Sequence, residues 1–291
     1  MINLASLRAK SEQEAAHFPA LLARADHIAG TILMGSHGRR RAGVGDDFWQ
    51  YRPFQTGDSP RGIDWRRSAR GDTHYVREHE WQIAQSVTLW VDQSASMDFK
   101  SDGIPESKAD RARLISLALT ILLTHGGERI GLAHPAVAPQ RGRPQVERIA
   151  QALMTSVQTD FCAPNAEAMP PFGRAVFVSD FLGDIDAITK AFTIAADRGV
   201  RGAIVQILDP VEESFPFSGR AIFQSMGGSV EHETLEAGGL KDQYLARLAE
   251  RKDKLMRLCD MAGWDYTCHH TDTPAQSALL WLWGVLDGRK S

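Results

Sequence analysis

Oxygen-bearing side chains gather where two apolar segments of the sequence end. The segment SVTLWVD ends at Asp92 and is followed by QSASM, so Asp92, Ser94 and Ser96 occupy every second position. A second apolar segment, RAVFVSD, ends at Asp180. Carboxylate and hydroxyl oxygens are hard ligands, which suit magnesium, manganese or calcium better than zinc. The spacing predicts a divalent-cation site built from Asp92, Ser94, Ser96 and Asp180.

The same spacing has a plain alternative, a polar turn. Serine and aspartate favour turns and helix caps on their own account. A chain of average composition and this length also contains an Asp-x-Ser-x-Ser spacing by chance with a probability of roughly 5–10%. What favours the cation site is its place at the end of one expected strand, with a second Asp-ended strand downstream.

The segments around these motifs alternate between expected strands and expected helices. The strands are SVTLWVD, RIGLAHP, RAVFVSD, VRGAIVQILD and WDYTCHHT. The helices are KADRARLISLALTILLTHGG, RPQVERIAQALMTSV, DIDAITKAFTIAADRG, GLKDQYLARLAERKDKLMRLCDMAGW and TPAQSALLWLWGVLDG. Strands separated by helices of ~10–15 residues predict an α/β fold, a mainly parallel sheet with helices on both faces. In such sheets sites form beyond the carboxyl ends of the strands, which brings Asp92 and Asp180 together.

Three regions are expected along the chain. Residues 1–34 form an N-terminal helical segment, and residues 35–85 form a small β-rich module rich in glycine, arginine and aromatic residues. Residues 86–291 form the α/β domain, in which FSGRAIFQSMGGSVEHETL predicts a hairpin that turns near Gly227 and Gly228.

Composition limits the classes of function. The 291 residues are 43% hydrophobic and 24% charged with a formal net charge of −3, so there is no global electrostatic reason to expect nucleic acid. Three widely spaced cysteines form no disulfide framework. No signal peptide and no run near the ~20 apolar residues of a membrane span is visible. We expect a cytoplasmic protein without a membrane span.

The segment RGIDWRRSARG mixes arginines with a tryptophan. This composition can bind nucleic acid through phosphate contacts and stacking. Several acidic residues lie close by in the sequence, however, so internal salt bridges or a protein-contact face for Arg66, Arg67 and Arg70 are favoured. Trp49 and Trp65 are expected to fill the core of the small module, because a small module needs large buried aromatics.

Two family resemblances follow from these motifs. VDQSASM followed by RAVFVSD resembles the metal-ion-dependent adhesion site of von Willebrand factor type A domains, which are Rossmann-like. FWQYRPFQTGDSPRGIDWRRSARGDTHYVREHE resembles the signature of the bacterial domain-of-unknown-function 58 family, and the likeness extends over about residues 35–290. The first resemblance implies that Asp92, Ser94 and Ser96 form the first motif and Asp180 the third.

The second motif of an adhesion site supplies a threonine, and here it is expected to be missing. The segment GLAHPAVAPQRGRPQVER contains neither threonine nor serine. Thr155 and Thr159 follow the next helix and are expected to lie too far along the chain. Arg141 or Arg143 can instead place a guanidinium beside the two aspartates and replace the cation.

The resemblance implies a non-enzymatic adaptor that acts with MoxR-type AAA+ ATPases and other type A domain proteins in chaperone-like assembly or maturation. The expected partner-binding residues are Arg141, in the loop near the cation site, and Arg66, Arg67 and Arg70, in the arginine-rich block. The alternative is a metal-dependent hydrolase or phosphatase that uses Asp92 and Asp180. No G-x-S-x-G or GxxxxGK[ST] motif is present, which excludes an α/β serine hydrolase and a P-loop ATPase.

Overall fold

The computed structural model describes most of the chain. The described residues are 19–33, 48–55, 63–69, 71, 73–79, 85–157, 159–167, 169–228 and 231–286. They divide into two compact units, of which the smaller is Met34–Ala84 and the larger comprises Met1–Leu33 and Gln85–Ser291.

The smaller unit is built on an antiparallel pair of strands, β1 (Phe48–Pro53) and β2 (Tyr75–His79), with one helical turn, α2 (Trp65–Ser68). Asp64 caps the turn by accepting a hydrogen bond from the Arg67 N–H. The Ser68 hydroxyl accepts a 2.9 Å hydrogen bond from the Tyr75 N–H, which ties α2 to β2. Trp65 is 62% exposed, and its ring meets the His74 ring edge-on, so its expected core position is wrong. The Trp49 side chain lies outside the described residues.

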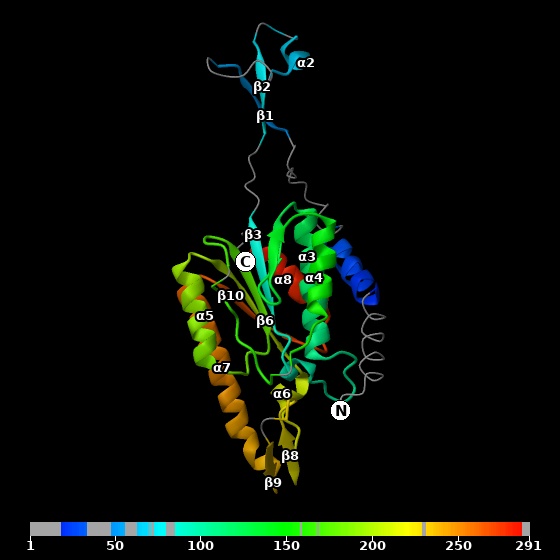
Figure 1. Ribbon diagram of the computed structural model, residues 1–291, viewed down its shortest axis with the longest axis vertical. Helices are drawn as coiled ribbons and strands as arrows, with labels where there is room; N and C mark the ends of the chain where they lie inside the picture. The colour runs from blue at the N-terminus through cyan, green and yellow to red at the C-terminus, as the bar shows by residue number, and fades with distance from the viewer. Residues whose placement is uncertain are drawn as a thin grey trace. The chain divides into compact units, whose positions relative to one another are not determined.

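The larger unit is organised by a six-stranded sheet with the order β10-β7-β6-β3-β4-β5 (Figure 1). Its strands are β3 (Ser86–Val91), β4 (Arg129–Leu132), β5 (Val137–Gln140), β6 (Arg174–Ser179), β7 (Arg201–Leu208) and β10 (Asp265–His270). All neighbouring pairs are parallel except β4 and β5. The central strands β3, β6 and β7 are buried nearly from end to end, as their continuous apolar runs require.

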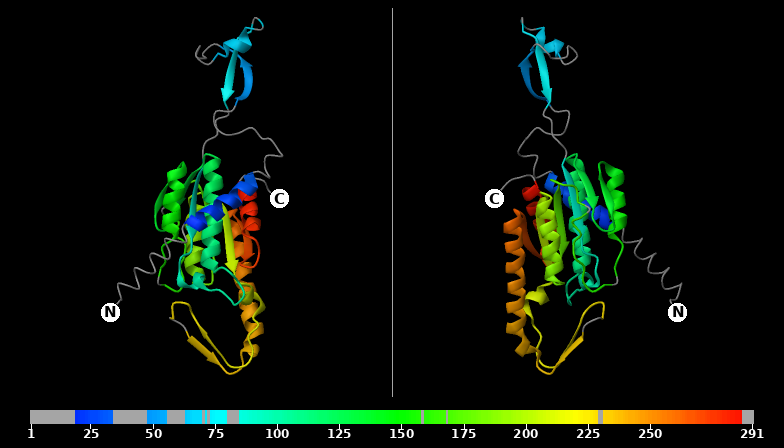
Figure 2. Two further views of the ribbon diagram at one scale, coloured as in Figure 1. Left: turned by 90° about the vertical axis from the view of Figure 1, so that its right-hand side faces the viewer. Right: turned by 60° about the vertical axis from the view of Figure 1, so that its left-hand side comes forward.

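Helices cover both faces of the sheet (Figure 2). One face carries α3 (Lys108–His125), α4 (Arg143–Leu153), α8 (Ala275–Leu286) and the helix over residues 19–33. The other face carries α5 (Ile185–Asp197) and α7 (Lys241–Ala262). The helix over residues 19–33 is buried at Ala25, Ile28, Ala29 and Ile32, so it is part of the core of the larger unit. The helix α3 is buried around almost its whole circumference, because other helices cover its outer side.

The mixed α/β fold with a mainly parallel sheet and helices on both faces is confirmed, and this arrangement is consistent with a type A-like domain. The antiparallel edge strand β5 was not predicted. Among the described residues, no helix combines the length and the apolar character needed to cross a membrane.

Short elements extend the larger unit beyond the carboxyl ends of the parallel strands (Figure 1). They are η2 (Ala95–Asp98), α6 (Pro210–Ser214), β8 (Ala221–Gln224), β9 (Glu231–Thr234) and η3 (Ala237–Leu240). Strands β8 and β9 pair antiparallel, which confirms the predicted hairpin. The helix α6 joins the end of β7 to this hairpin.

Gly202 allows β6 and β7 to approach each other, and Gly202→Ala tests this contact. A Cβ at Gly202 would lie 1.8 Å from the carbonyl oxygen of Ala175, its partner on β6. The hydrogen bonds of the sheet fix the distance between these central strands, so the backbone cannot move apart to make room for the added methyl group. We therefore expect the free energy of unfolding in urea to fall by about 3 kcal/mol.

The matched control is Gly284→Ala in α8, where a Cβ would meet nothing within 4 Å. This variant is expected to gain up to about 1 kcal/mol, because alanine favours a helix more than glycine does. Equal midpoints for the two variants would contradict the packing argument.

Candidate functional site

The structure brings the two expected aspartates together at the carboxyl ends of β3 and β6. These strands are parallel neighbours, and the Asp92 N–H continues their ladder by donating to the Val178 carbonyl at 2.9 Å. Asp92, Ser94, Ser96 and Asp180 are all buried. The four residues therefore form one polar cluster inside the protein, closed to bulk solvent.

Asp92 is held by groups from both strands. Its Oδ1 accepts the Ser94 N–H at 2.9 Å, and its Oδ2 accepts the Ser179 hydroxyl at 2.7 Å. The hydroxyls of Ser94 and Ser96 lie 3.3 Å apart. Burial and, after it, the charge of Asp180 raise the pKa of Asp92 above its ordinary value near 3.8. The two carboxylates thus repel each other unless a positive charge lies nearby.

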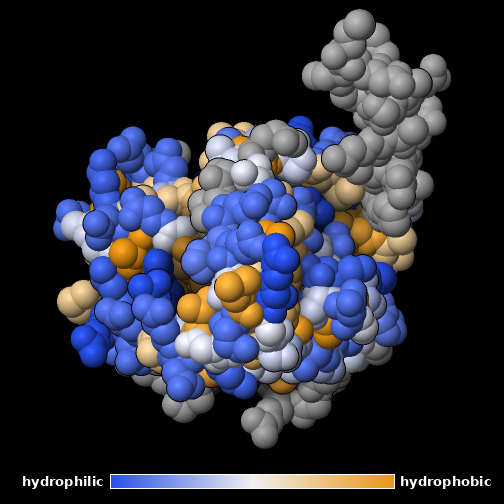
Figure 3. All heavy atoms as spheres, turned by 90° about the horizontal axis from the view of Figure 1, so that it is seen from below, coloured by the Kyte–Doolittle hydropathy of each residue, from blue (hydrophilic) through white to orange (hydrophobic). Residues whose placement is uncertain are grey.

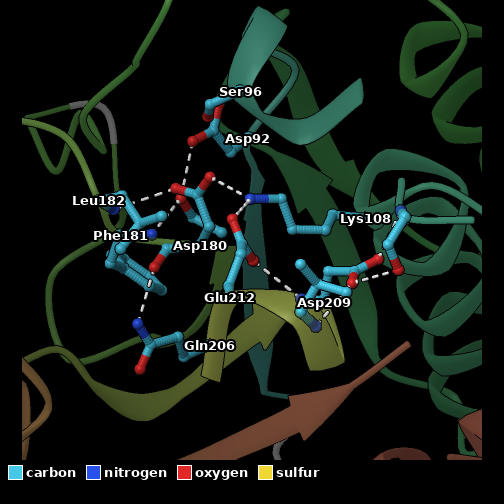
Figure 4. A network of polar contacts seen from close by, with 12 residues as sticks. Asp92, Ser96, Lys108, Asp180, Phe181, Leu182, Gln206, Asp209 and Glu212 are labelled. Carbon is cyan, nitrogen blue, oxygen red and sulfur yellow. Dashed lines mark hydrogen bonds and ion pairs between the residues drawn. The ribbon is translucent and has the colours of Figure 1, made fainter. Parts of the chain in front are cut away.

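That positive charge is the ammonium of Lys108 (Figure 4). Its Nζ lies 2.9 Å from Asp180 Oδ2 and 2.6 Å from Glu212 Oε1. The Lys108 side chain is only 1% exposed. An ammonium needs such partners when it is taken out of water, because an unpaired buried charge costs several kcal/mol.

The start of α3 places this ammonium. Ser107 caps the helix and exchanges hydrogen bonds with Asp110 in a capping box, so Lys108 is the first helical residue. A positive charge at a helix N-terminus opposes the helix dipole. Burial by itself lowers the pKa of Lys108, but the charges of Asp180 and Glu212 outweigh it and hold this pKa above its usual value. Lys108 therefore stays charged at neutral pH.

Glu212 reaches Lys108 because α6 is held by its own capping box. Asp209 caps the helix, and Glu212 Oε2 accepts the Asp209 N–H at 2.8 Å. Asp209 also accepts the Ser101 hydroxyl at 2.6 Å and the Ser101 N–H at 3.0 Å. Burial raises the pKa of Glu212, and the ammonium of Lys108 opposes that rise. The segment before α3 and the segment after β7 are thereby joined at one point.

The residues present do not fit a divalent cation bound to Asp180 in this arrangement. Lys108 already supplies the positive charge at Asp180 Oδ2, and the other oxygen, Oδ1, accepts the Leu182 N–H at 3.0 Å. A second cation would be repelled by the ammonium at short range, where little water screens the two charges. The cluster has the donor types of a cation site with a lysine in the place of the cation.

The expectation that Arg141 or Arg143 brings the positive charge is wrong. Strand β5 runs antiparallel to β4, and Gln140 pairs with Ile130 near the start of β4. Arg141 therefore lies at the amino end of the sheet, exposed and close enough to Glu128 to lower the pKa of that carboxyl, which burial raises. Arg143 begins α4 at the same end and is also exposed.

The expectation that Thr155 and Thr159 lie too far away is also wrong. The segment after α4 runs along the first motif, where the Ala95 N–H donates to the Thr159 carbonyl at 2.9 Å. The Thr155 hydroxyl donates to the Gln93 side chain at 2.7 Å, and the Thr159 hydroxyl lies 3.3 Å from the Cys162 sulfur. Both threonines thus lie beside the site.

Two of the expected partner-binding arginines belong to the smaller unit. Arg66 and Arg67 are exposed on α2, and the Arg67 guanidinium lies 5.4 Å from the centre of the Tyr75 ring. Arg70 lies outside the described residues. Two further acidic residues, Asp98 and Asp184, follow the two motifs closely in the sequence. Asp98 is exposed on η2. Asp184 caps α5 by accepting the Asp186 N–H at 2.9 Å, which is a structural role.

The sequence analysis did not identify Lys108 and Glu212 as residues of the site. A lysine at the start of a helix is normally solvated, so its letter carries no signal of burial. Two weaker signals were present. The lysine opposes the dipole of a helix that is otherwise apolar, and DPVE has the spacing of a capping box whose glutamate points back toward the strand end.

Comparison with known proteins now becomes informative. The family model described as "Protein of unknown function DUF58" matches residues 50–254. The chain belongs to the DUF58 family. The uncharacterized protein Rv1480 of Mycobacterium tuberculosis (strain H37Rv) is 30% identical over 238 residues, which cover 76% of this DUF58 chain and 74% of Rv1480. The uncharacterized protein Mb1516 of Mycobacterium bovis has the same identity and coverage.

Solved structures give a distant likeness to this DUF58 protein. BatB from Bacteroides thetaiotaomicron is 12% identical, with a TM-score of 0.35, and the match covers 70% of this chain and 100% of BatB. An aerotolerance-related membrane protein from Bacteroides fragilis is 10% identical, with a TM-score of 0.37 and the same coverage. The family resemblance expected from the arginine-rich signature is confirmed, whereas the type A resemblance stays a prediction.

Lys108→Met tests the buried ammonium. It leaves Asp180 and Glu212 facing each other without a counter-charge, which is expected to lower the free energy of unfolding by about 3–5 kcal/mol. The measurement is chemical denaturation, with Lys190→Met as control because Lys190 is exposed on α5 and its loss should change stability by less than about 0.5 kcal/mol. Equal stability of the two variants would show that Lys108 carries no buried charge.

Asp92→Asn tests the raised pKa of Asp92. The folded protein binds the proton of this carboxyl more tightly than the unfolded chain does. The contribution of the protonated Asp92 to the free energy of unfolding is therefore fully present below about pH 4, and it is lost as the pH rises through the raised pKa. Asparagine does not ionise. The stability of Asp92→Asn relative to wild type should therefore increase between pH 3.5 and pH 7. A constant or falling difference would contradict the raised pKa.

Proposed function

We propose that this DUF58 protein is a non-enzymatic protein-binding adaptor whose contact surface lies on the β8–β9 hairpin. The observation that carries the proposal is the pairing of Asp180 with Lys108. A hydrolase would need these carboxylates open to a substrate or to an activated water. Here they are buried and neutralised from within, which supports a structural role for the cluster and a binding role for the exposed surface beside it.

The hairpin surface is the exposed part of the β8–β9 hairpin and of the segments beside it, and it carries five exposed apolar side chains. They are Phe161, Phe217, Ile222, Met226 and Leu235. Figure 3 looks at this end of the molecule and shows apolar side chains exposed among hydrophilic ones. Side chains alternate along β8, so Ile222 points away from Phe223 and from Phe217, which packs against Phe223. The exposed apolar side chain of Ile222 on this outer face is typical of a protein contact. Glu231 on β9 adds an exposed acidic group that suits a partner with basic residues, whereas Glu233 is paired with Arg220 of the same hairpin.

The buried ion pair fixes the position of α6, the helix that leads into the hairpin. Glu212 fixes α6, and the chain then turns at Phe215, whose φ of +41° is left-handed. The Phe215 ring packs against Phe217, Phe223 and Tyr244, with ring centres 4.9–5.7 Å apart. At the tip of the hairpin the Ser225 hydroxyl donates to Asp160 Oδ2 at 2.9 Å. The hairpin is therefore anchored at its base and at its tip.

The partner that we propose is a MoxR-type AAA+ ATPase, with other type A domain proteins in the same assembly. What supports this is the resemblance of the two motifs to type A domain proteins. We propose Arg66 and Arg67, both exposed on α2, as a second contact site. The three cysteines are free thiols, which supports a reducing compartment such as the cytoplasm.

Partner binding is tested with a MoxR-type ATPase purified from the same organism. The variant Ile222→Ser removes one apolar side chain from the hairpin surface and is expected to weaken binding about tenfold, because a central contact residue contributes ~1–2 kcal/mol. Leu280→Ser on α8 is the matched control, since Leu280 and Ile222 are both 59% exposed. The measurement is the dissociation constant by biolayer interferometry. Equal affinities for both variants would remove the hairpin from the interface.

Cation binding is tested by calorimetric titration of chelator-treated protein with magnesium, manganese and calcium. We propose that Lys108 takes the place of the cation, so no saturable heat that depends on Asp92 is expected for the wild type. Heat that disappears in Asp92→Ala would contradict this proposal. Phosphatase turnover that requires magnesium or manganese and is lost in Asp92→Ala would instead establish the hydrolase.

A further inference from the structure

A second cluster of ligand-type side chains lies on the other side of α6. It combines Glu213 of α6 with Cys268 and His270 of β10. Residues two apart on a strand point to the same face, so the sulfur and the imidazole lie side by side. The carboxylate, thiol and imidazole ligand atoms all lie within 4.8 Å of one another.

The contact between His270 and Glu213 is incomplete. His270 Nε2 lies 2.7 Å from Glu213 Oε2, but the two groups are not oriented as a hydrogen bond, and Nε2 is buried without another partner among the described residues. Two acceptor atoms at this distance repel each other unless a proton or a cation lies between them. The Lys252 ammonium of α7 contacts Glu213 and lies beside the Cys268 thiol, so it supplies one positive charge.

The geometry points to a zinc-type metal site formed by Glu213, Cys268 and His270, and we propose that this protein binds one zinc ion there. A thiolate, an imidazole and a carboxylate are the ligands that zinc takes in proteins, and three protein ligands leave a fourth position for water or a partner's side chain. When the ion binds, the Cys268 thiol loses its proton to solvent and Lys252 moves away from Glu213.

The site is close to the required dimensions and accessible. Bonds of about 2.0–2.3 Å at tetrahedral angles separate the ligand atoms by roughly 3.3–3.8 Å. The His270 Nε2 and Glu213 Oε2 atoms, now 2.7 Å apart, must therefore separate slightly, and ligand atoms that lie up to 4.8 Å apart must approach by about 1 Å. The side chains of His270 and Glu213 are 28% and 33% exposed, so neither is locked in the core and both can make such a shift. The soft sulfur ligand also separates this site chemically from the oxygen cluster around Asp92.

Cobalt(II) is the probe, used on the chelator-treated full chain, because a sulfur ligand gives it a near-ultraviolet charge-transfer band and a tetrahedral site gives it intense visible bands. The wild type is expected to bind one equivalent with both features, and zinc should displace it. Cys268→Ser should abolish the near-ultraviolet band, and His270→Ala should weaken binding at least tenfold. Cys162→Ser and Cys259→Ser are matched controls that should keep the band.

The variant Lys252→Met tests the proposal without changing a ligand, in case a ligand variant fails to fold. Removal of the competing ammonium should tighten cobalt binding severalfold, whereas a merely structural lysine would leave affinity unchanged or lower it. The proposal is overturned if the wild type shows no sulfur-to-cobalt band at excess metal, which would mean an ion-pair cluster only. It is also overturned if the band survives in Cys268→Ser, or if Asp92→Asn alone abolishes binding.

Discussion

A buried ammonium holds together the segments at the carboxyl end of the central sheet. Lys108 belongs to the first turn of α3, Asp180 follows β6, and Glu212 belongs to α6, so one charged group joins three segments. An ion pair of this kind adds little net stability, because the cost of removing the charges from water offsets their attraction. Its effect is on geometry: each of the three segments has one position in which every charge is paired.

Hydrogen bonds connect these three segments to the neighbouring loops and to the hairpin. Asp92 is tied to β6 through Ser179, and the backbone of Ala95 and Ser96 donates to Thr159 and Asp160 of the segment after α4. Asp160 in turn holds the tip of the hairpin through Ser225. The path therefore begins and ends at elements that Lys108 positions, at the end of β6 and at α6. The proposed contact surface lies on the hairpin, which this path reaches through Asp160 and Ser225.

The order of strands and helices and the mainly parallel sheet were predictable, because apolar runs indicate buried strands and helical periodicity indicates the helices that cover them. The proximity of Asp92 and Asp180 follows from the parallel arrangement of β3 and β6, because the carboxyl ends of neighbouring parallel strands lie at the same edge of the sheet. The prediction for Arg141 failed because β5 is four residues long, contains a proline and turns back along the sheet, so the next residue arrives at the opposite end. The role of Lys108 was hidden for another reason, since only the folded chain brings together partners 72 and 104 residues away.

The edge strand β5 also limits how copies of this protein can associate. Pro139 has no N–H, and prolines in edge strands discourage the addition of a further strand from another chain. At this edge, self-association by a shared sheet is disfavoured. At the β5 edge, a contact with another chain is then made by side chains, which can be released and remade, rather than by a continuous backbone ladder.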